Sequence, residues 1–280
     1  MSFRFTKMQA LGNDFVVIDA VNQSIDLSVA QRRLLADRHR GIGFDQLLLL
    51  EPAQSLGVDF RYRIFNADGG EVAQCGNGAR CLARFILESG LSAKAEFVVE
   101  TLQGRLRLRQ QAANSFSASL GVPRFAPAEI PHQLAGQGPS YPLSVAGQEL
   151  VLWLVNVGNP HAVIQINPQQ PVDVEQVSRA LATHPGFPEG VNVGFLSLVS
   201  ADPAEIHLRV YERGAGQTQA CGSGACAAAV IALTQGWCQG PVTVKQPGGE
   251  LRVEWGGDAT EVWLSGPAES VFEGFWLASE

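Results

Sequence analysis

Hydrophobic and polar residues alternate along three short stretches in the first half of the chain. These are FRFTKM (3–8), DFVVIDA (14–20) and FRYRIFN (60–66). Such alternation is typical of β-strands that are buried on one face. Further strands are predicted in EFVVETLQGRLRLRQ (96–110) and VTVKQPGGELRVEWGG (242–257), where glycine interrupts the alternation and indicates a turn. The pattern therefore predicts a chain that consists mainly of sheet.

Two helices are predicted, and each begins near a Cys-Gly pair. The first is expected at residues 76–88, because Ser89-Gly90 is a typical helix end, and the second at residues 222–235, before Gly236. The second helix is apolar almost all round. A helix of this kind must be covered on every side, most simply by the sheet of its own domain.

The strongest pattern in the chain is an internal repeat. Residues 62–87 align without a gap with residues 208–233, an offset of 146 residues. The identical pairs are Arg63/Arg209, Gly70/Gly216, Cys75/Cys221, Gly76/Gly222, Gly78/Gly224, Ala79/Ala225, Ala83/Ala229 and Leu87/Leu233. The same offset places Gly12-Asn13 on Gly158-Asn159 and Gln46 on Asn192. A period this long indicates two domains of one fold rather than a solenoid of short units.

The repeat leads to a specific fold prediction. We expect an α/β protein of two pseudo-symmetric domains, each a curved, barrel-like and mostly antiparallel sheet wrapped around a central helix. The first domain is expected to comprise residues 1–119 plus 267–280, and the second residues 120–266. The Pro- and Gly-rich segment 121–144 is the candidate for the crossover between them.

Composition and charge exclude several classes of protein. Glycine accounts for 30 of 280 residues, and the net charge is −7 with no basic block in either half. A nucleic-acid surface requires clustered Lys and Arg, so nucleic acid is not expected as a partner. Residues 214–244 carry no charge, but several glutamines interrupt them, which favours a buried helix over a membrane span.

The five cysteines are an odd number, and the N-terminal residues lack the apolar core of a signal peptide. We therefore expect free thiols and a cytoplasmic location. Cys81, Cys226 and Cys238 have no counterpart in the repeat, which favours a role as small buried apolar side chains. Cys75 and Cys221 match across the repeat and need another explanation.

The two matched cysteines each stand at the start of a predicted helix, in the sequences CGNG (75–78) and CGSG (221–224). The helix dipole and the free N–H groups of the first turn favour a thiolate there, and the same N–H groups can bind a carboxylate. Glycine lets a ligand approach the backbone. A thiolate on one face of a carbon and a thiol on the other could invert that carbon by removing one proton and returning another.

Other chemistries fit the residues less well. The spacing of Cys75 to Cys81 and of Cys221 to Cys226 lacks the C-x2-C form of a zinc knuckle, and no histidine cluster accompanies it, so no metal is expected. The glycine-rich loops do not end in the Gly-Lys-Ser/Thr of a phosphate loop. None of the three lysines lies near such a loop, which argues against a pyridoxal phosphate Schiff base.

Six segments together resemble the diaminopimelate epimerase family. They are QALGNDFVVID (9–19), GFDQ (43–46), NADGGEVAQCGNGARC (66–81), VGNPHAV (157–163), GVNVGF (190–195) and ERGAGQTQACGSGACA (212–227). The resemblance implies a cofactor-independent epimerase that interconverts LL- and meso-2,6-diaminopimelate in the synthesis of lysine and peptidoglycan precursors. It also implies a homodimer, because the segment SVFEGFW (270–276) is similar to the strand through which members of the family dimerise.

The resemblance also implies a role for individual residues. Cys75 and Cys221 match the two acid/base thiols, and His161 and Glu212 match residues that tune them. The expected substrate-contacting side chains are Asn13, Gln46, Asn66, Asn159, Asn192, Glu212 and Arg213. Gly76-Asn77 and Gly222-Ser223 match the backbone donors to the reacting carboxylate.

Two alternatives remain open at this point. Proline racemase and hydroxyproline epimerase also use two cysteines. Their cyclic substrates, however, have no second amino-carboxylate group for Arg213 and the amide side chains to bind. A thiol redox protein could use Cys75 and Cys221 as a disulfide pair. Such a protein has no need of the surrounding asparagines.

Overall fold

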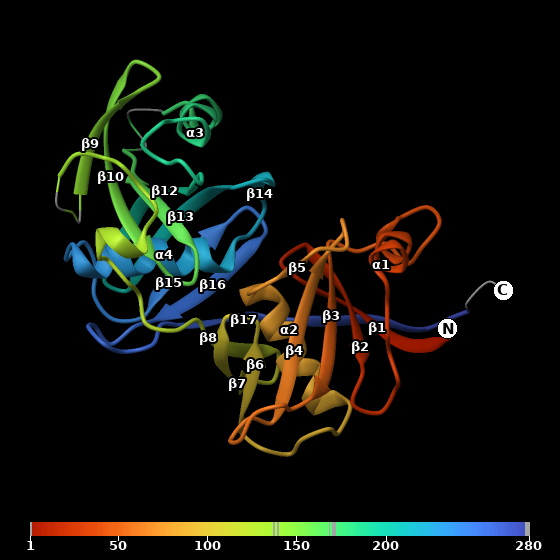
Figure 1. The fold of residues 1–280 in the computed structure, drawn as a ribbon. Helices are drawn as coiled ribbons and strands as arrows, with labels where there is room; N and C mark the ends of the chain where they lie inside the picture. The colour runs from red at the N-terminus through yellow and green to blue at the C-terminus, as the bar shows by residue number, and fades with distance from the viewer. Residues whose placement is uncertain (1, 137, 139, 168, 170–171, 278–280) are drawn as a thin grey trace. The chain divides into compact units, whose positions relative to one another are not determined.

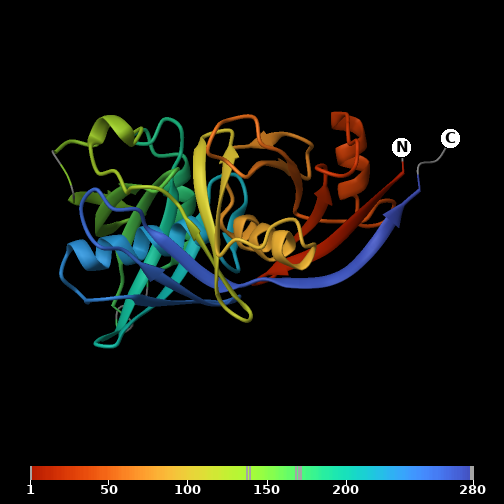
Figure 2. The same ribbon diagram turned by 90° about the horizontal axis from the view of Figure 1, so that it is seen from below.

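The computed structural model describes residues 2–136, 138, 140–167, 169 and 172–277 (Figures 1 and 2). It divides into two compact units, Met1–Ser119 with Ser265–Glu280 and Leu120–Leu264. The expected crossover segment 121–144 lies in the second unit, and positions 137 and 139 within it lie outside the described residues, as do positions 278–280 of the predicted first domain.

The first unit is built on one sheet with a central helix. Its strands are β1 (Phe3–Ala10), β2 (Asn13–Asp19), β3 (Gln46–Pro52), β4 (Phe60–Asn66), β5 (Glu71–Val72), β6 (Glu96–Thr101), β7 (Gly104–Ala112), β8 (Ser115–Ser119) and β18 (Glu269–Trp276). They pair in the order β18-β1-β2-β3-β4-β6-β7-β8, with β5 added to β4. All of these pairs are antiparallel except β2–β3 and β4–β6.

The second unit repeats this arrangement. Its strands are β9 (Ser140–Val145), β10 (Gln148–Asn156), β11 (Pro160–Gln165), β12 (Asn192–Ala201), β13 (Ala204–Glu212), β14 (Gly216–Thr218), β15 (Val242–Gln246) and β16 (Gly249–Glu254). They pair in the order β9-β10-β11-β12-β13-β15-β16, with β14 added to β13. The parallel pairs are again the third and fifth, β11–β12 and β13–β15. Strand β17 (Trp263–Pro267) then leads back into the first unit.

The strand registers confirm the duplication residue by residue. Strand β2 pairs Phe15 with Gln46 of β3, and β11 pairs His161 with Asn192 of β12. Both members of the second pair lie at the repeat offset from those of the first. The sequence repeat is therefore a structural repeat, which fixes the equivalent positions compared below.

Each unit holds one helix inside its sheet, as predicted (Figure 2). Helix α2 (Gly76–Glu88) contacts β1, β2, β3, β7, β8 and β18. Helix α4 (Gly222–Thr234) contacts β10 to β13, β15 and β16. Helix α2 has the predicted bounds, whereas α4 ends one residue earlier than expected. Gln235 caps α4, donating its N–H to the carbonyls of Ile231 and Leu233, and Gly236 then turns the chain with a φ of 67°.

Among the described residues, three further helical segments lie outside these central helices: α1 (Val29–Ala36), the 3-10 turn η1 (Pro127–Glu129) and α3 (Val174–Ala182). Ser28 and Gln31 form a capping box at the start of α1, and Asp173 caps α3. In the part of the chain that the structure describes, no helix has the length and apolar character needed to cross a membrane. The uncharged run 214–244 contains α4, which has only 13 residues.

Candidate functional site

In the first unit, Cys75 is the N-cap residue of α2. Its backbone is extended (φ −147°, ψ 111°), and its sulfur accepts a hydrogen bond from the N–H of Gly78 at 3.3 Å. The side chain is partly exposed. A sulfur that faces the first turn of a helix lies in the positive end of the helix dipole, which favours the thiolate.

The glycine at position 78 is required by close packing. A Cβ built on Gly78 would collide with the Tyr62 hydroxyl and approach Leu48 Cδ2 to 3.2 Å. Gly78 lies in the first turn of the helix, where its backbone N–H points at the Cys75 sulfur. Because glycine has no side chain, the Tyr62 hydroxyl can occupy the adjacent space. The same reasoning holds for Gly224 in the second unit, where a Cβ would lie 2.8 Å from Val210 Cγ2.

Amide side chains surround the first turn of α2. Asn77 is buried, and its Nδ2 donates to Asn13 Oδ1 at 3.4 Å. Asn13 follows the tight turn at Gly12, which has a φ of 83°, and its own Nδ2 donates to Asp45 Oδ2 at 2.9 Å. The structure therefore brings Asn13, Asn77 and Cys75 together in one unit.

Gln46 and Asn66 form a second pair in the first unit. They lie opposite each other at the ends of β3 and β4, and Gln46 Nε2 donates to Asn66 Oδ1 at 2.9 Å. The hydrogen bond fixes the orientation of both amides. The backbone N–H of Asn66 donates to Gly70 O at 2.9 Å, which closes the turn after the strand.

In the second unit, Cys221 is the N-cap residue of α4 in the same geometry. Its backbone is extended (φ −123°, ψ 115°), and its sulfur accepts from the N–H of Gly224 at 3.3 Å. Gln246 holds the cysteine backbone from both sides, accepting from its N–H at 2.9 Å and donating to its carbonyl at 3.3 Å. The loop that presents the sulfur is thus fixed by a neighbouring strand.

The surroundings of Cys221 favour the protonated thiol. Burial raises the pKa of Cys221 well above its ordinary value, and the nearby Glu212 carboxylate raises it further. Hydrogen bonds from Ser223 and Gly224 act in the opposite direction. Ser223 Oγ lies 3.6 Å from the sulfur. Burial and the neighbouring carboxylate therefore favour the thiol of Cys221 over its thiolate.

His161 bridges two predicted site residues of the second unit. Its Nε2 lies 3.0 Å from Asn159 Oδ1 and 3.0 Å from Ser223 Oγ. The ring is 1% exposed, and burial lowers the pKa of His161 to about 3, so the imidazole is neutral. A neutral ring with its proton on Nε2 donates to these oxygens, which leaves the Ser223 hydroxyl proton for the sulfur of Cys221.

Replacing His161 by Gln is expected to change how stability depends on pH. In the wild type, the unfolded chain takes up a proton below the ordinary histidine pKa of 6.5 that the folded chain does not bind. Its unfolding free energy should therefore fall on acidification below pH 6.5, with a slope of up to about 1.4 kcal/mol per pH unit. Urea unfolding between pH 6.5 and pH 4.5 should show a shallower slope for His161→Gln. The control His39→Gln, at an exposed position, should follow the wild type, and parallel curves for all three proteins would contradict the account.

The remaining predicted residues lie at the ends of β12 and β13. Asn192 is buried, donates to Pro160 O at 3.1 Å and accepts from the Arg213 N–H at 2.9 Å. The Arg213 side chain is exposed and donates to Glu189 O at 2.7 Å. Glu212 Oε1 accepts from Thr218 Oγ1 at 2.6 Å. Asn192 and Arg213 therefore lie on neighbouring strand ends, joined through the Arg213 backbone N–H. They offer a fixed amide and an exposed guanidinium, two groups that can bind a carboxylate.

Several residues that support the site carried no recognisable sequence signal. Tyr62 and Gln246 come from strands separated in the chain from their partners Gly78 and Cys221, and Thr218 lies on the short strand that follows Glu212. Asp45 precedes Gln46 directly, but only its contact with Asn13 gives it a role. The three cysteines expected to be structural, Cys81, Cys226 and Cys238, are all buried.

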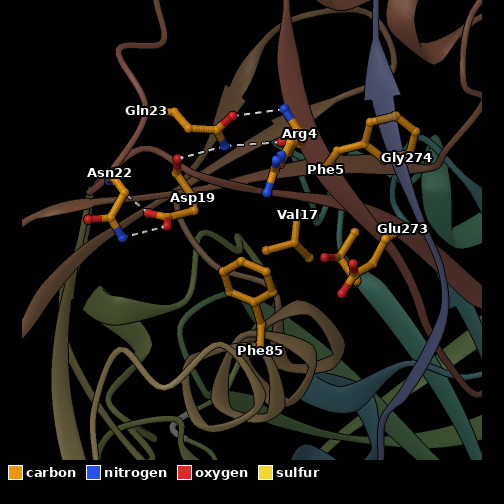
Figure 3. Close-up of a pocket in the computed structure, with 10 residues that line it drawn as sticks. Arg4, Phe5, Val17, Asp19, Asn22, Gln23, Phe85, Glu273 and Gly274 are labelled. Atoms are coloured by element: carbon orange, nitrogen blue, oxygen red, sulfur yellow. Dashed lines mark hydrogen bonds between the residues drawn. The ribbon is translucent and has the colours of Figure 1, made fainter.

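A separate pocket of about 410 Å³ lies in the first unit and contains none of the predicted site residues (Figure 3). It is lined by Arg4, Phe5, Thr6, Val17, Asp19, Asn22, Gln23, Phe85, Glu273 and Gly274. Many polar groups at the rim of this pocket are already hydrogen-bonded to one another. Asn22 donates to the Asp19 carboxylate, and the Arg4 backbone N–H donates to the Gln23 side chain. The pocket therefore does not compete with the cysteine loops as the candidate site.

Solved structures with the same fold include several isomerases. The chain is similar to a phenazine biosynthesis protein of the PhzF family from Bacillus anthracis, with a TM-score of 0.69 at 17% identity over 99% of this chain and 100% of that chain. It is also similar to a hydroxyproline epimerase from Agrobacterium vitis, with a TM-score of 0.68 at 16% identity over 98% and 91% of the two chains. At this identity the likeness shows the fold alone.

Sequence comparison is more specific. A sequence model described as diaminopimelate epimerase matches residues 5–125 and 153–271, one match in each repeat. The diaminopimelate epimerase of Stutzerimonas stutzeri is 50% identical over 274 residues, which cover 98% of this chain and 99% of that protein. The fold is duplicated and a cysteine caps the central helix of each unit. Together with these features, the match over nearly the full length confirms the resemblance seen in the sequence. The chain belongs to the diaminopimelate epimerase family.

Proposed function

We propose that the protein interconverts LL- and meso-2,6-diaminopimelate, an isomerisation at one carbon that needs no cofactor. The observation that carries the proposal is the pair of cysteines at equivalent helix N-termini of a duplicated fold. It is supported by the 50% identity to a diaminopimelate epimerase over 98% of the chain. This activity belongs to the synthesis of lysine and of peptidoglycan precursors.

In the proposed mechanism, Cys75 and Cys221 each serve one face of the reacting carbon. The thiolate of one cysteine removes the proton, and the thiol of the other delivers a proton from the opposite side, so one C–H bond breaks and another forms. The buried surroundings that keep Cys221 protonated suit it to deliver the first proton. In the reverse direction the two thiols exchange roles.

The negative charge that develops during deprotonation needs a stabilising partner. We assign this role to the backbone N–H groups of Gly76-Asn77 and Gly222-Ser223, which lie in the first turns of α2 and α4. Donors that are already oriented stabilise charge more strongly than water can, because they need not reorganise. His161 and Glu212 tune Cys221 through Ser223 and through charge.

The remaining polar residues fit the rest of this substrate. Diaminopimelate carries a second amino-carboxylate group at its far end, and its recognition requires a cation and several amides. Arg213 presents an exposed guanidinium, its backbone N–H holds the Asn192 amide, and Asn66 is oriented by Gln46. We assign Asn13, Asn159 and Glu212 to substrate contacts as well. A cyclic proline substrate has no second amino-carboxylate group for Arg213 and these amides to bind.

The direct test is incubation of the purified protein with LL-diaminopimelate and no added cofactor, followed by separation of the isomers. We expect the meso isomer to form until equilibrium is reached, and no conversion of L-proline under the same conditions. Racemisation of proline without turnover of diaminopimelate would favour the proline racemase alternative. Peroxide-dependent gain of activity would favour a redox role.

We further propose a homodimer formed through β18. This strand exposes Val271, Phe272 and Phe275 by 57%, 49% and 56% respectively, which is unusual for a chain without a partner. Sedimentation equilibrium should give twice the chain mass of 29.9 kDa, and a single-chain mass would contradict the proposal. A cytoplasmic location fits two thiols that must stay reduced, and cell fractionation tests it.

A further inference from the structure

Arg80 is a fully buried cation on α2, with 0% of its surface exposed. Its guanidinium donates to Asn77 Oδ1 at 3.0 Å, to Gly76 O at 3.4 Å and to Pro267 O at 3.3 Å. Burial of a charge is costly unless hydrogen bonds compensate it. The second unit shows that the fold does not require a cation here, because the equivalent residue is the neutral, buried Cys226.

The contacts of Arg80 continue through the amides of the first half-site. Asn77 accepts from Arg80 and donates to Asn13 Oδ1 at 3.4 Å, and Asn13 donates to Asp45 Oδ2 at 2.9 Å. A guanidinium can only donate and an ionised carboxylate can only accept. Arg80 at one end and Asp45 at the other therefore fix the direction of every amide between them.

In the second unit, a different residue orients the equivalent side chains. There, His161 Nε2 lies 3.0 Å from Asn159 Oδ1 and 3.0 Å from Ser223 Oγ, the equivalents of Asn13 and Asn77. The position of His161 is taken by Phe15 in the first unit, which is apolar and completely buried. Each unit thus links the second residue after its cysteine to the asparagine of a Gly-Asn turn: Asn77 to Asn13 in the first unit, and Ser223 to Asn159 in the second.

We propose that Arg80 is a positioning residue for the Cys75 half of the site and does for Asn77 and Asn13 what His161 does for Ser223 and Asn159. The proposal rests on the proposed function, because Asn77 and Asn13 matter only if they face the substrate. Arg80 itself acts through Asn77. Its loss should free the Asn77 amide to turn and leave the N–H groups beside Cys75 less well oriented.

The test is a double-mutant cycle on kcat/KM for LL-diaminopimelate with Arg80→Met and Asn77→Ala. We expect Arg80→Met to lower kcat/KM by between about tenfold and a hundredfold, the loss typical of misplaced binding groups. If Arg80 acts through Asn77, the double variant should lose little more than Asn77→Ala alone. Additive losses, or less than a twofold effect of Arg80→Met, would overturn the proposal.

Arg84→Met is the matched control. Arg84 lies one turn further along α2, donates to Ala268 O at 2.7 Å and pairs with Glu88, so it also ties the helix to the returning chain. Its variant should lose stability without coupling to Asn77→Ala. If Arg80→Met does not fold, the same double-mutant cycle is measured with Arg80→Lys, which keeps the positive charge but loses the planar guanidinium. An inactive wild type would instead contradict the proposed function.

Discussion

Replacing either Cys75 or Cys221 by alanine is expected to lower kcat by at least ~10³-fold, about 4 kcal/mol of barrier, while the fold is retained. Each variant lacks the proton carrier of one face, and inversion needs both. The double variant should therefore be no slower than either single variant, as for residues that act as a unit. Steady-state rates in both directions, with circular dichroism as the check on folding, measure the effect.

Cys81→Ala supplies the control for these variants. Cys81 lies on the same helix as the proposed Cys75 acid/base residue and is completely buried, so its replacement removes a thiol without touching the helix N-terminus. Its rate should stay within a few-fold of the wild type. A Cys75→Ala or Cys221→Ala variant that keeps more than about a tenth of kcat, a loss below ~1.4 kcal/mol, would mean that the assignment of the thiols is wrong.

Gly78→Ala should also be severely damaging, although alanine usually stabilises a helix relative to glycine. The new Cβ would meet the buried Tyr62 hydroxyl, so α2 or Tyr62 must move. We expect a loss of about 1–3 kcal/mol in the free energy of unfolding, as for other overpacked cores. Because Gly78 N–H binds the Cys75 sulfur, kcat should fall by about a hundredfold as the cap shifts.

Tyr62→Phe should rescue Gly78→Ala. The Tyr62 hydroxyl is buried without a hydrogen-bond partner among the described residues, so its removal alone should cost little stability. The double variant lacks the clash with the hydroxyl and needs only a small shift of the Leu48 side chain, so it should recover most of the activity and stability. Failure of Tyr62→Phe to improve Gly78→Ala would show that the steric account is incorrect.

The sequence repeat is the reason that so much of the fold could be predicted. Glycine after each central helix and the matched Cys-Gly pairs located both helices to within one residue. The alternation of apolar residues located β4 at residues 60–66. Helices α1 and α3 were not predicted, although Ser28 with Gln31, and Asp173, are recognisable capping residues in hindsight.

The candidate site was harder to predict where the two halves differ. Alignment of the repeats indicates Cys75, Asn13 and Gln46 because each has an equivalent in the other half. It cannot indicate Arg80, whose equivalent is Cys226, because nothing in the local pattern shows that the side chain turns inward to Asn77. The Arg80 side chain is also held by Pro267 O, as Cys221 is held by Gln246, and such contacts depend on packing between segments that are distant in sequence.

The most direct test of the two-thiol mechanism is the cofactor-free reaction of LL-diaminopimelate run in D2O and stopped at low conversion. A thiol carries a single proton, so the proton removed by one cysteine stays on that cysteine while the other delivers solvent deuterium. The two-thiol mechanism predicts meso product that is fully deuterated at the inverted carbon, with almost no label in the remaining LL substrate. Substantial protium at that carbon of the product, measured by mass spectrometry of the separated isomers, would contradict it.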